Sequence, residues 1–291
     1  MWKATILLTV TILTLLLSTC SSYSDTEEPL KIGITSWVGY YPIFYAYEKG
    51  WLEKNNIELT QMASLYESTR MYKHGYINIM LGTQYEYNIL SKKHKSMKII
   101  KFLDRSNGGD IIMSNRTIKE LQNSKLIEVY LEVNSVNRLL LLDFMKKYKI
   151  QREQVKLINI NQDYIDSLAL SKSNKSIAII TYNPYNYKHN ANGFVEIIST
   201  KDNDLLIVDI LFARSSVLNN HKNQIKTLKI LIDEAIEISK NNPDDFFNVV
   251  SKVLPTSREE YETSIGSIKW ININRSDELT NNLKSRNLIE F

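Results

Sequence analysis

Aromatic and acidic side chains are concentrated in or beside short segments that follow apolar runs of the chain. The aromatic residues are Trp37, Tyr40 and Tyr182, and the acidic residues are Asp110, Glu132 and Asp209. The face of an aromatic ring attracts a cation with about 0.5–2 kcal/mol, and a carboxylate supplies the opposite charge. If these side chains share one cleft, that cleft suits a cationic or amine-bearing solute, or a flat heteroaromatic such as an aminopyrimidine.

The opposite charge is also represented near these segments. An inorganic anion or a sulfonate requires Arg, Lys or free amide groups, and Arg105 and Arg138 stand close to the same segments. The sequence alone therefore leaves the sign of the solute open. We favour a nitrogenous organic solute over nitrate or sulfonate.

Several of the polar residues also have a purely structural interpretation. Asp110 is either a ligand-binding acid or part of a turn, and Ser135 is either a helix cap or a contact at a helix N-terminus. Asp209 lies within the apolar run LLIVDILFA. An ionised carboxylate is costly there unless it is paired or faces a cleft, so we favour a functional role for Asp209.

The elements that must position these residues alternate between apolar and helical patterns. Apolar runs bounded by Gly, Asn or Ser predict strands over 30–35, 57–62, 77–81, 97–103, 110–114, 126–132, 155–160, 176–182 and 205–213. Helical patterns cover 42–53, 65–74, 84–94, 135–148, 163–171, 224–240, 242–253 and 257–266. This alternation predicts a largely parallel sheet with helices on its faces. The polar segments then lie at the carboxyl ends of strands, where such folds bind ligands.

The aromatic segment SWVGYYPIFYAYEKGW divides at Pro42. Proline is favoured at the first position of a helix, so a helix is predicted over 42–53. Its apolar face is predicted to carry Phe44, Tyr47 and Trp51 into the core. Trp37 and Tyr40 precede the helix on a loop, and we expect them to contact a ligand.

Composition and motifs exclude several classes of function. Hydrophobic residues make up 43% and charged residues 23% of the 291 residues, as in a globular protein, and a net charge of +4 gives no nucleic-acid footprint. The four histidines are widely separated, and the chain has no Cys/His cluster, nucleotide-binding glycine motif or GxSxG elbow. We therefore expect no catalytic residues, no metal site and no cofactor.

The N-terminus indicates export and anchoring. The uncharged run over 4–17 is shorter than the roughly 20 residues of a membrane span and suits a signal peptide, predicted over 1–19. It ends in LSTC, which contains the single cysteine of the chain and resembles a bacterial lipobox. Cys20 is therefore the predicted lipidation site, and the polar residues 20–29 read as a tether. The alternative is an incidental Cys near an ordinary secretory signal.

A set of motifs in a fixed order resembles a known family. The motifs are Trp37-Val38-Gly39-Tyr40, Ser106-Asn107-Gly108-Gly109-Asp110, Glu132-Val133-Asn134-Ser135-Val136, Thr181-Tyr182-Asn183-Pro184 and Ile207-Val208-Asp209-Ile210-Leu211. Their order resembles the extracytoplasmic solute-binding proteins of ABC importers of the nitrate/sulfonate/taurine and thiamine-precursor type. The resemblance covers most of residues 30–215.

The resemblance implies a bilobed, periplasmic-binding-protein-like fold of type 2, in which two doubly wound α/β lobes joined by a hinge close on a small solute. We expect 30–113 and 205–291 to form lobe 1 and 114–204 to form lobe 2. The expected ligand-binding residues are Trp37, Tyr40, Thr83, Ser106, Asp110, Glu132, Ser135, Tyr182 and Asp209. The expected partner is an ABC permease, reached by a monomer held outside the cytoplasm through its lipid anchor, with no nucleic acid involved.

Two other functions remain open at this point. The same fold could serve a sensor that passes its ligand, or its closed conformation, to a membrane-bound signalling partner. An enzyme of pyrimidine-precursor synthesis with a related fold is disfavoured by the signal peptide and by the absent Cys/His constellation.

Overall fold

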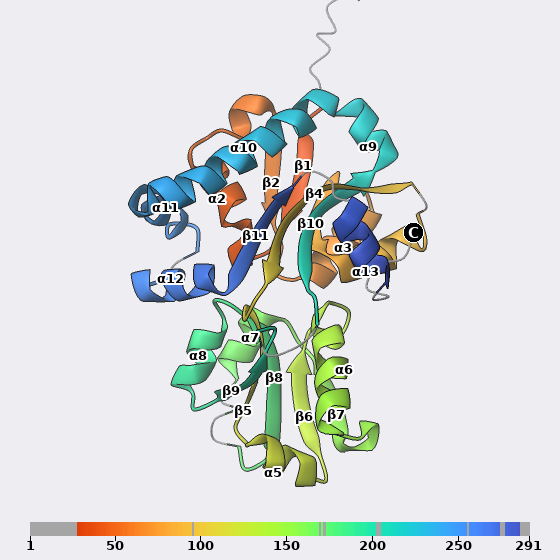
Figure 1. Cartoon of the computed structure of the whole chain (residues 1–291), viewed down its shortest axis with the longest axis vertical. Helices are drawn as coiled ribbons and strands as arrows, with labels where there is room; N and C mark the ends of the chain where they lie inside the picture. The colour runs from red at the N-terminus through yellow and green to blue at the C-terminus, as the bar shows by residue number, and fades with distance from the viewer. Residues whose placement is uncertain are drawn as a thin grey trace, which may run out of the picture.

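The computed structural model describes residues 28–94, 96–168, 170, 173–201, 205–254, 256–273 and 277–285. The predicted signal peptide, Cys20 and most of the predicted tether lie outside these ranges. No helix within them is both long and apolar enough to cross a bilayer. The described residues form two α/β lobes, which lie one above the other along the long axis of the molecule (Figure 1).

The first lobe is built on a six-stranded sheet in the order β11-β4-β10-β3-β1-β2. Its strands are β1 (Leu30–Ile34), β2 (Ile57–Gln61), β3 (Ile79–Thr83), β4 (Met97–Ser106), β10 (Val208–Arg214) and β11 (Ile268–Ile273). β1 pairs in parallel with β2 and β3, whereas β10 is antiparallel to β3 and β4, and β11 is antiparallel to β4. The prediction of a largely parallel sheet is therefore wrong for this lobe. The chain leaves it along β4 and returns along β10 in the opposite direction.

Helices cover both faces of this sheet. They are α2 (Tyr41–Glu48), α3 (Leu65–Lys73), α4 (Gln84–Ser91), α9 (Ser215–Asn220), α10 (Lys222–Asn241), α11 (Pro243–Val250), α12 (Arg258–Gly266) and α13 (Asp277–Ser285), with short 3-10 turns η1 (Val38–Tyr40) and η2 (Glu53–Asn55). Apolar residues of α2, α10 and α11 pack with β1 in one core cluster. Those of α3 and α4 pack in a second cluster, which continues into the other lobe as far as α6.

The predicted helix over 42–53 is shorter than expected. α2 ends at Glu48, and Gly50 adopts a positive φ of 69°, which stops the helix. The predicted core position Tyr47 is 48% exposed, whereas Tyr45 is buried. The reason is that α10 and α11 cover the opposite side of α2, where the Tyr45 ring stacks on Phe246 with centroids 5.0 Å apart.

The second lobe contains a five-stranded sheet in the order β7-β6-β8-β5-β9. Its elements are β5 (Asp110–Ser114), α5 (Ile118–Asn123), β6 (Ile127–Leu131), α6 (Asn137–Tyr148), η3 (Arg152–Gln154), β7 (Val155–Asn159), α7 (Gln162–Ser167), β8 (Ser176–Tyr182), α8 (Asn186–Ala191) and β9 (Val195–Ser199). β6 is parallel to β7 and β8, and β5 is antiparallel to β8 and β9.

The placement of residues 110–113 in lobe 1 is wrong, because β5 pairs within the second sheet. The chain therefore passes between the lobes directly after β4, at the Asn107-Gly108-Gly109 turn. It returns just before β10, and the two crossings are joined by hydrogen bonds. Ser106 N donates to Ile207 O at 3.0 Å, and Gly108 N donates to Thr200 Oγ1 at 2.9 Å. Two adjacent crossings of this kind suit a hinge.

Candidate functional site

A cavity lies between the lobes, near the carboxyl ends of β1, β3 and β8. Its lining comes from both lobes and consists of Thr35, Trp37, Tyr40, Leu65, Thr83, Asp110, Val136, Tyr182, Ile207 and Asp209. The space open to the centre of a water-sized sphere is about 20 Å³, which is room for about one water molecule. A larger solute therefore enters only if the lobes separate or the side chains move.

Trp37 reaches across the cavity from the loop after β1. Its ring meets the Tyr182 ring of the second lobe edge to face, with centroids 5.9 Å apart, and its Nε1 donates to Asp104 Oδ1 at 3.4 Å. Two glycines make this position possible. A side chain at Gly39 would collide with the Asp104 carboxyl group, and one at Gly109 would collide with the Trp37 ring.

Tyr40 and Asp209 form the floor of the cavity in the first lobe. The Tyr40 hydroxyl donates to Asp209 Oδ1 at 2.6 Å. Asp209 on β10 lies opposite Asp104 on β4 in the antiparallel register, so two carboxyl groups stand on neighbouring strands. Burial raises the pKa of both, and their mutual repulsion raises it further for Asp209. Two carboxyl groups this close do not both ionise unless a positive charge compensates them.

Asp110 begins β5 and contributes the carboxyl group of the second lobe. Its backbone N–H donates to Ser106 Oγ at 3.0 Å, and its Oδ2 is buried without a hydrogen-bond partner. Burial raises the pKa of Asp110 to about 7, a hydrogen bond with Ser106 lowers it, and the charge of Glu86 raises it. Ser106 therefore acts behind the cavity, where its Oγ also lies 2.7 Å from Thr200 Oγ1 at the crossing between the lobes.

Glu132 and Ser135 lie beside the cavity and not in its lining. Glu132 follows β6, and its Oε1 is buried without a partner. Burial raises the pKa of Glu132 to about 8, with a further contribution from Glu86. Ser135 Oγ donates to Glu132 O at 2.9 Å and so holds the turn before α6. The helix begins at Asn137, two residues later than predicted.

Glu86 is a residue that sequence reasoning missed. It is the third residue of α4, where its Oε2 accepts from the backbone and hydroxyl groups of Thr83 in a capping box. Its Oε1 accepts from Val136 N at 3.0 Å. Since Val136 belongs to the second lobe, this carboxylate joins the two lobes. Burial raises the pKa of Glu86 as well.

Asp104 is the second residue that was missed. The argument that singled out Asp209, an acid within an apolar strand, applies equally to Asp104 in MKIIKFLDRS. The predicted strand ended at 103 and excluded it. The capping-box pattern T-x-x-E at 83–86 was likewise readable, but its contact with the second lobe depends on the fold.

The arrangement places rings and carboxyl groups around one cavity without a counter-charge. No Lys, Arg or His within the described ranges lines the cavity, and no ion pair among the described residues reaches Asp104, Asp110, Glu132 or Asp209. In the described part of the chain, no group of three or more His, Cys, Asp or Glu is arranged to hold a metal ion. The chemistry available here is binding of a hydrogen-bond donor or cation against aromatic rings.

Comparisons with known proteins agree with this architecture. The sequence model of the NMT1/THI5-like family matches residues 37–246. A sequence search of curated proteins found no match. Among solved structures, the chain is similar to the periplasmic aliphatic sulphonate-binding protein SsuA from Escherichia coli. The TM-score is 0.71, the identity is 12%, and 90% of each chain is covered.

Two further structures show the same fold. The ligand-binding component of an ABC-type import system from Staphylococcus aureus, solved with zinc bound, has a TM-score of 0.69 and 15% identity, covering 90% of this chain and 93% of that chain. The periplasmic nitrate-binding protein NrtA from Synechocystis PCC 6803 has a TM-score of 0.62 and 12% identity, covering 81% of this chain and 68% of that chain. The predicted periplasmic-binding-protein-like fold is confirmed.

Proposed function

The chain belongs to the NMT1/THI5-like family, and on that premise we propose that it is the solute-binding protein of an ABC importer. The names of the structural neighbours support this role, since they are a ligand-binding component of such a system, a sulphonate-binding protein and a nitrate-binding protein. In this role the lobes close on a small solute by hinge motion and present it to a membrane permease. The chain itself carries out no reaction.

We propose further that the solute carries a cationic or amine-bearing nitrogen. The observation that carries this proposal is the pair of buried carboxyl groups, Asp110 and Asp209, that face the cavity without a counter-charge. A solute N–H would donate to the unpartnered Asp110 Oδ2 and lie against the rings of Trp37 and Tyr182. Such a solute would also relieve the repulsion among the carboxyl groups.

The sulphonate- and nitrate-binding neighbours are named for anions, and an anion favours a different lining. Anions require Arg, Lys or free N–H donors, whereas the described side chains of this cavity supply carboxylates and hydroxyl groups. We therefore propose that this chain differs from those neighbours in the charge of its solute.

A thermal-shift screen of the soluble chain from Ser21 onward tests this function. The screen uses amines, aminopyrimidines, sulfonates and nitrate as separate groups. A solute at 100 times its Kd adds about 2.7 kcal/mol to the free energy of unfolding, which raises the melting temperature by several degrees. We expect stabilisation by amines or aminopyrimidines. Stabilisation confined to sulfonates or nitrate would overturn the proposed charge and leave the binding role intact.

We also propose that the chain acts as a monomer outside the cytoplasm, anchored through a lipid on Cys20. Stable anchoring by acyl chains requires two or more of them, and the short tether would keep the protein near its permease and raise the effective concentration. Replacing Cys20 by Ala should move the protein from the membrane fraction to the soluble fraction. Retention of the variant in the membrane fraction would contradict the lipid anchor.

A further inference from the structure

The end of the first lobe that lies opposite the cavity is basic. β10 ends there, and α9 leads across it to the first turns of α10 (Figure 1, top). The parallel strands β1, β2 and β3 begin at this end, and α3 and α4 lead to the starts of β3 and β4. Its exposed cations, which we name the basic end, are Lys73, Lys92, Lys93, Lys98, Lys222 and Lys226. Glu28 and Asp277 lie beside it. The acids Glu53 and Glu58 lie beside it as well, because β2 begins next to the start of β1 and Gln224 of α10 donates to Asn56 O. Together with Glu48 they line a groove along the edge strand β2.

The charges in the first turns of α10 run against the preference of a helix dipole, whereas Lys240 in its last turn follows that preference. Lys222 and Lys226 occupy its first two turns, no acid stands in the first turn, and Asp233, Glu234 and Glu237 follow in its second half. The helix dipole favours acids at the N-terminus and cations at the C-terminus. α11 and α12 obey this rule, with two acids each in their first turns. Lys222 and Lys226 therefore gain nothing from the helix dipole at their positions.

The chain enters the described structure beside these lysines. Gln224 on α10 donates through Nε2 to Glu28 O at 3.2 Å and to Asn56 O at 2.7 Å. This fastens the first described residue to the start of α10. From Cys20 to Glu28 a chain spans at most about 28 Å when fully extended. A lipid on Cys20 would therefore hold the basic end close to the bilayer, and this step alone rests on the proposed anchor.

We propose that the basic end binds the anionic headgroups of a lipid bilayer. Each Lys near an anionic membrane surface strengthens binding about fivefold, and the effect decays within a Debye length. With this end on the bilayer, the second lobe points away from the membrane and the cleft stays open to the solute. The lipid anchor sets the distance, and the lysines set the orientation.

Co-sedimentation with vesicles tests this surface without the anchor. The unacylated chain from Ser21 is mixed with vesicles of phosphatidylglycerol and phosphatidylcholine in equal parts, or of phosphatidylcholine alone. We expect binding to the anionic vesicles only, weakening as salt increases. The double variant Lys222→Gln/Lys226→Gln should lose about 25-fold in vesicle affinity, the product of two fivefold steps. The matched control Lys146→Gln/Lys147→Gln, on α6 of the second lobe, should bind as the parent does.

Three outcomes would overturn the proposal: equal binding to both vesicle types, no binding at low salt, or the same loss in the control pair. Vesicle binding could also stay unchanged in Lys222→Gln/Lys226→Gln while solute uptake in cells falls. That result would mean that the basic end binds a protein and not a lipid, and it would equally overturn the proposal. Failure of the proposed lipid anchor, or of the proposed solute binding in the cleft, can be distinguished from failure of this proposal. The protein in the vesicle assay carries no acyl chain, so that assay does not depend on the anchor. Both double variants should keep the thermal shift that the parent shows with a solute.

Discussion

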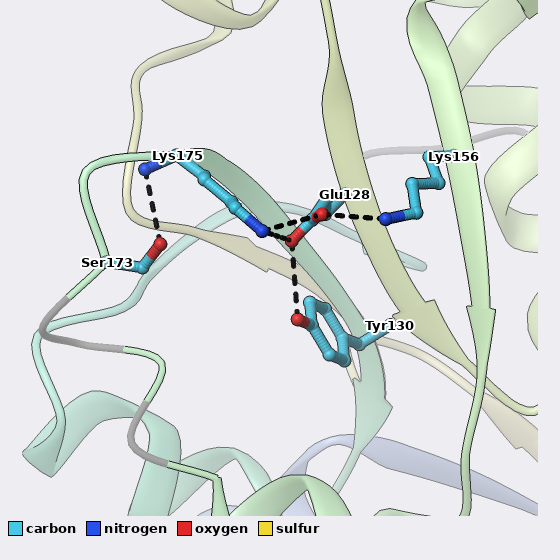
Figure 2. A network of polar contacts seen from close by, with 5 residues as sticks. All are labelled: Glu128, Tyr130, Lys156, Ser173 and Lys175. Atoms are coloured by element: carbon cyan, nitrogen blue, oxygen red, sulfur yellow. Dashed lines mark hydrogen bonds and ion pairs between the residues drawn. The ribbon is translucent and has the colours of Figure 1, made fainter.

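Two sets of buried carboxyl groups in this molecule differ in their counter-charges. Glu128 on β6 is 4% exposed and Asp209 in the cleft is 3% exposed. Glu128 lies 3.1 Å from Lys156 Nζ and 2.9 Å from Lys175 Nζ, as Figure 2 shows. The hydrogen bonds from these lysines lower the pKa of Glu128, whereas burial raises the pKa of Asp209. Similar exposure thus gives opposite electrostatics.

The difference lies in what covers each carboxyl group. Glu128 is covered by the two lysines, whose own side chains are 57% and 64% exposed and therefore keep their charges in water. The cleft carboxyl groups are covered by rings, apolar side chains and one another. The chain itself supplies the counter-charges of Glu128, which lies outside the cavity lining. In the cleft we propose that the solute supplies them.

Asp209→Asn gives the largest effect we expect. The amide keeps an oxygen for the Tyr40 hydroxyl but removes the negative charge. Losing one partner of a buried charge pair costs about 2–5 kcal/mol, so affinity for the best amine or aminopyrimidine of the screen should fall by about 100-fold or more. Without solute the variant should be as stable as the parent or more stable, since it removes a buried carboxyl group that has no counter-charge among the described residues. Isothermal titration calorimetry and urea unfolding measure the two quantities.

Glu128→Gln is the matched control for this variant, because it removes a carboxyl group of similar exposure that already has its cations. It should leave solute affinity unchanged. Equal loss of affinity in both variants would show that the loss comes from altered structure, and the comparison between the two sets would fail.

The pH dependence of stability is the next largest effect. The pKa of Asp110 is raised to about 7 and that of Glu132 to about 8, above usual values near 4. The unfolded chain therefore loses these protons at lower pH than the folded chain, and stability falls as pH rises. Each unit of pKa shift is worth about 1.4 kcal/mol. We expect urea unfolding of the solute-free protein to lose at least about 2 kcal/mol between about pH 5 and pH 8.

A cationic solute should reverse this trend in binding. Ionised carboxylates attract it and protonated ones do not, so affinity should rise over the same pH range, with release of protons on binding. The contribution of Glu128 to stability has the opposite pH dependence. Its pKa is lowered, so the stability that it contributes is lost only as the solution becomes acidic. Stability that stays level from pH 5 to pH 8 would remove the electrostatic difference between the two sets.

Trp37→Leu should have an intermediate effect. A ring face contributes about 0.5–2 kcal/mol to binding of a cation, so affinity should fall by roughly tenfold. Trp51→Leu is the control, because Trp51 meets Tyr45 edge to face with centroids 5.5 Å apart and lies outside the cavity lining. That variant should lose stability in urea unfolding and keep its affinity. The reverse pattern would place Trp37 in the core and Trp51 at the ligand.

Sequence reasoning found the buried strands, which have continuous apolar runs, and two edge strands, β2 and β7. β9 and β11 were not predicted, although they are edge strands of the same partly buried kind. All four edge strands carry polar residues that interrupt the apolar run, such as Glu196 in β9 and Lys269 in β11, so the local signal is weak in each. The buried face of α2 could not be predicted either, because it is determined by packing against α10 and α11, which lie far along the chain.

The candidate site was readable where it depended on position after a strand. Trp37, Tyr40 and Asp110 could be located in this way, because carboxyl ends of strands meet at one edge. The pairing of Asp209 with Asp104 depends on two strands far apart in sequence, and the bond from Glu86 to Val136 joins two lobes. Those contacts depend on the tertiary structure and leave no signal in the local sequence.

The smallest effect concerns the stability of Glu128→Gln, and it limits how far the comparison extends. Because its lysines are exposed, each ion pair is worth at most about 1 kcal/mol. The free energy of unfolding near neutral pH should therefore fall by no more than about 1 kcal/mol, and less at high salt, where exposed charges are screened. A loss well above this value that is insensitive to salt would mean that Glu128 is held as an interior charge. Its lysines would then be structural partners of the kind the cleft lacks, and the contrast with Asp209 would be sharper than exposure alone suggests.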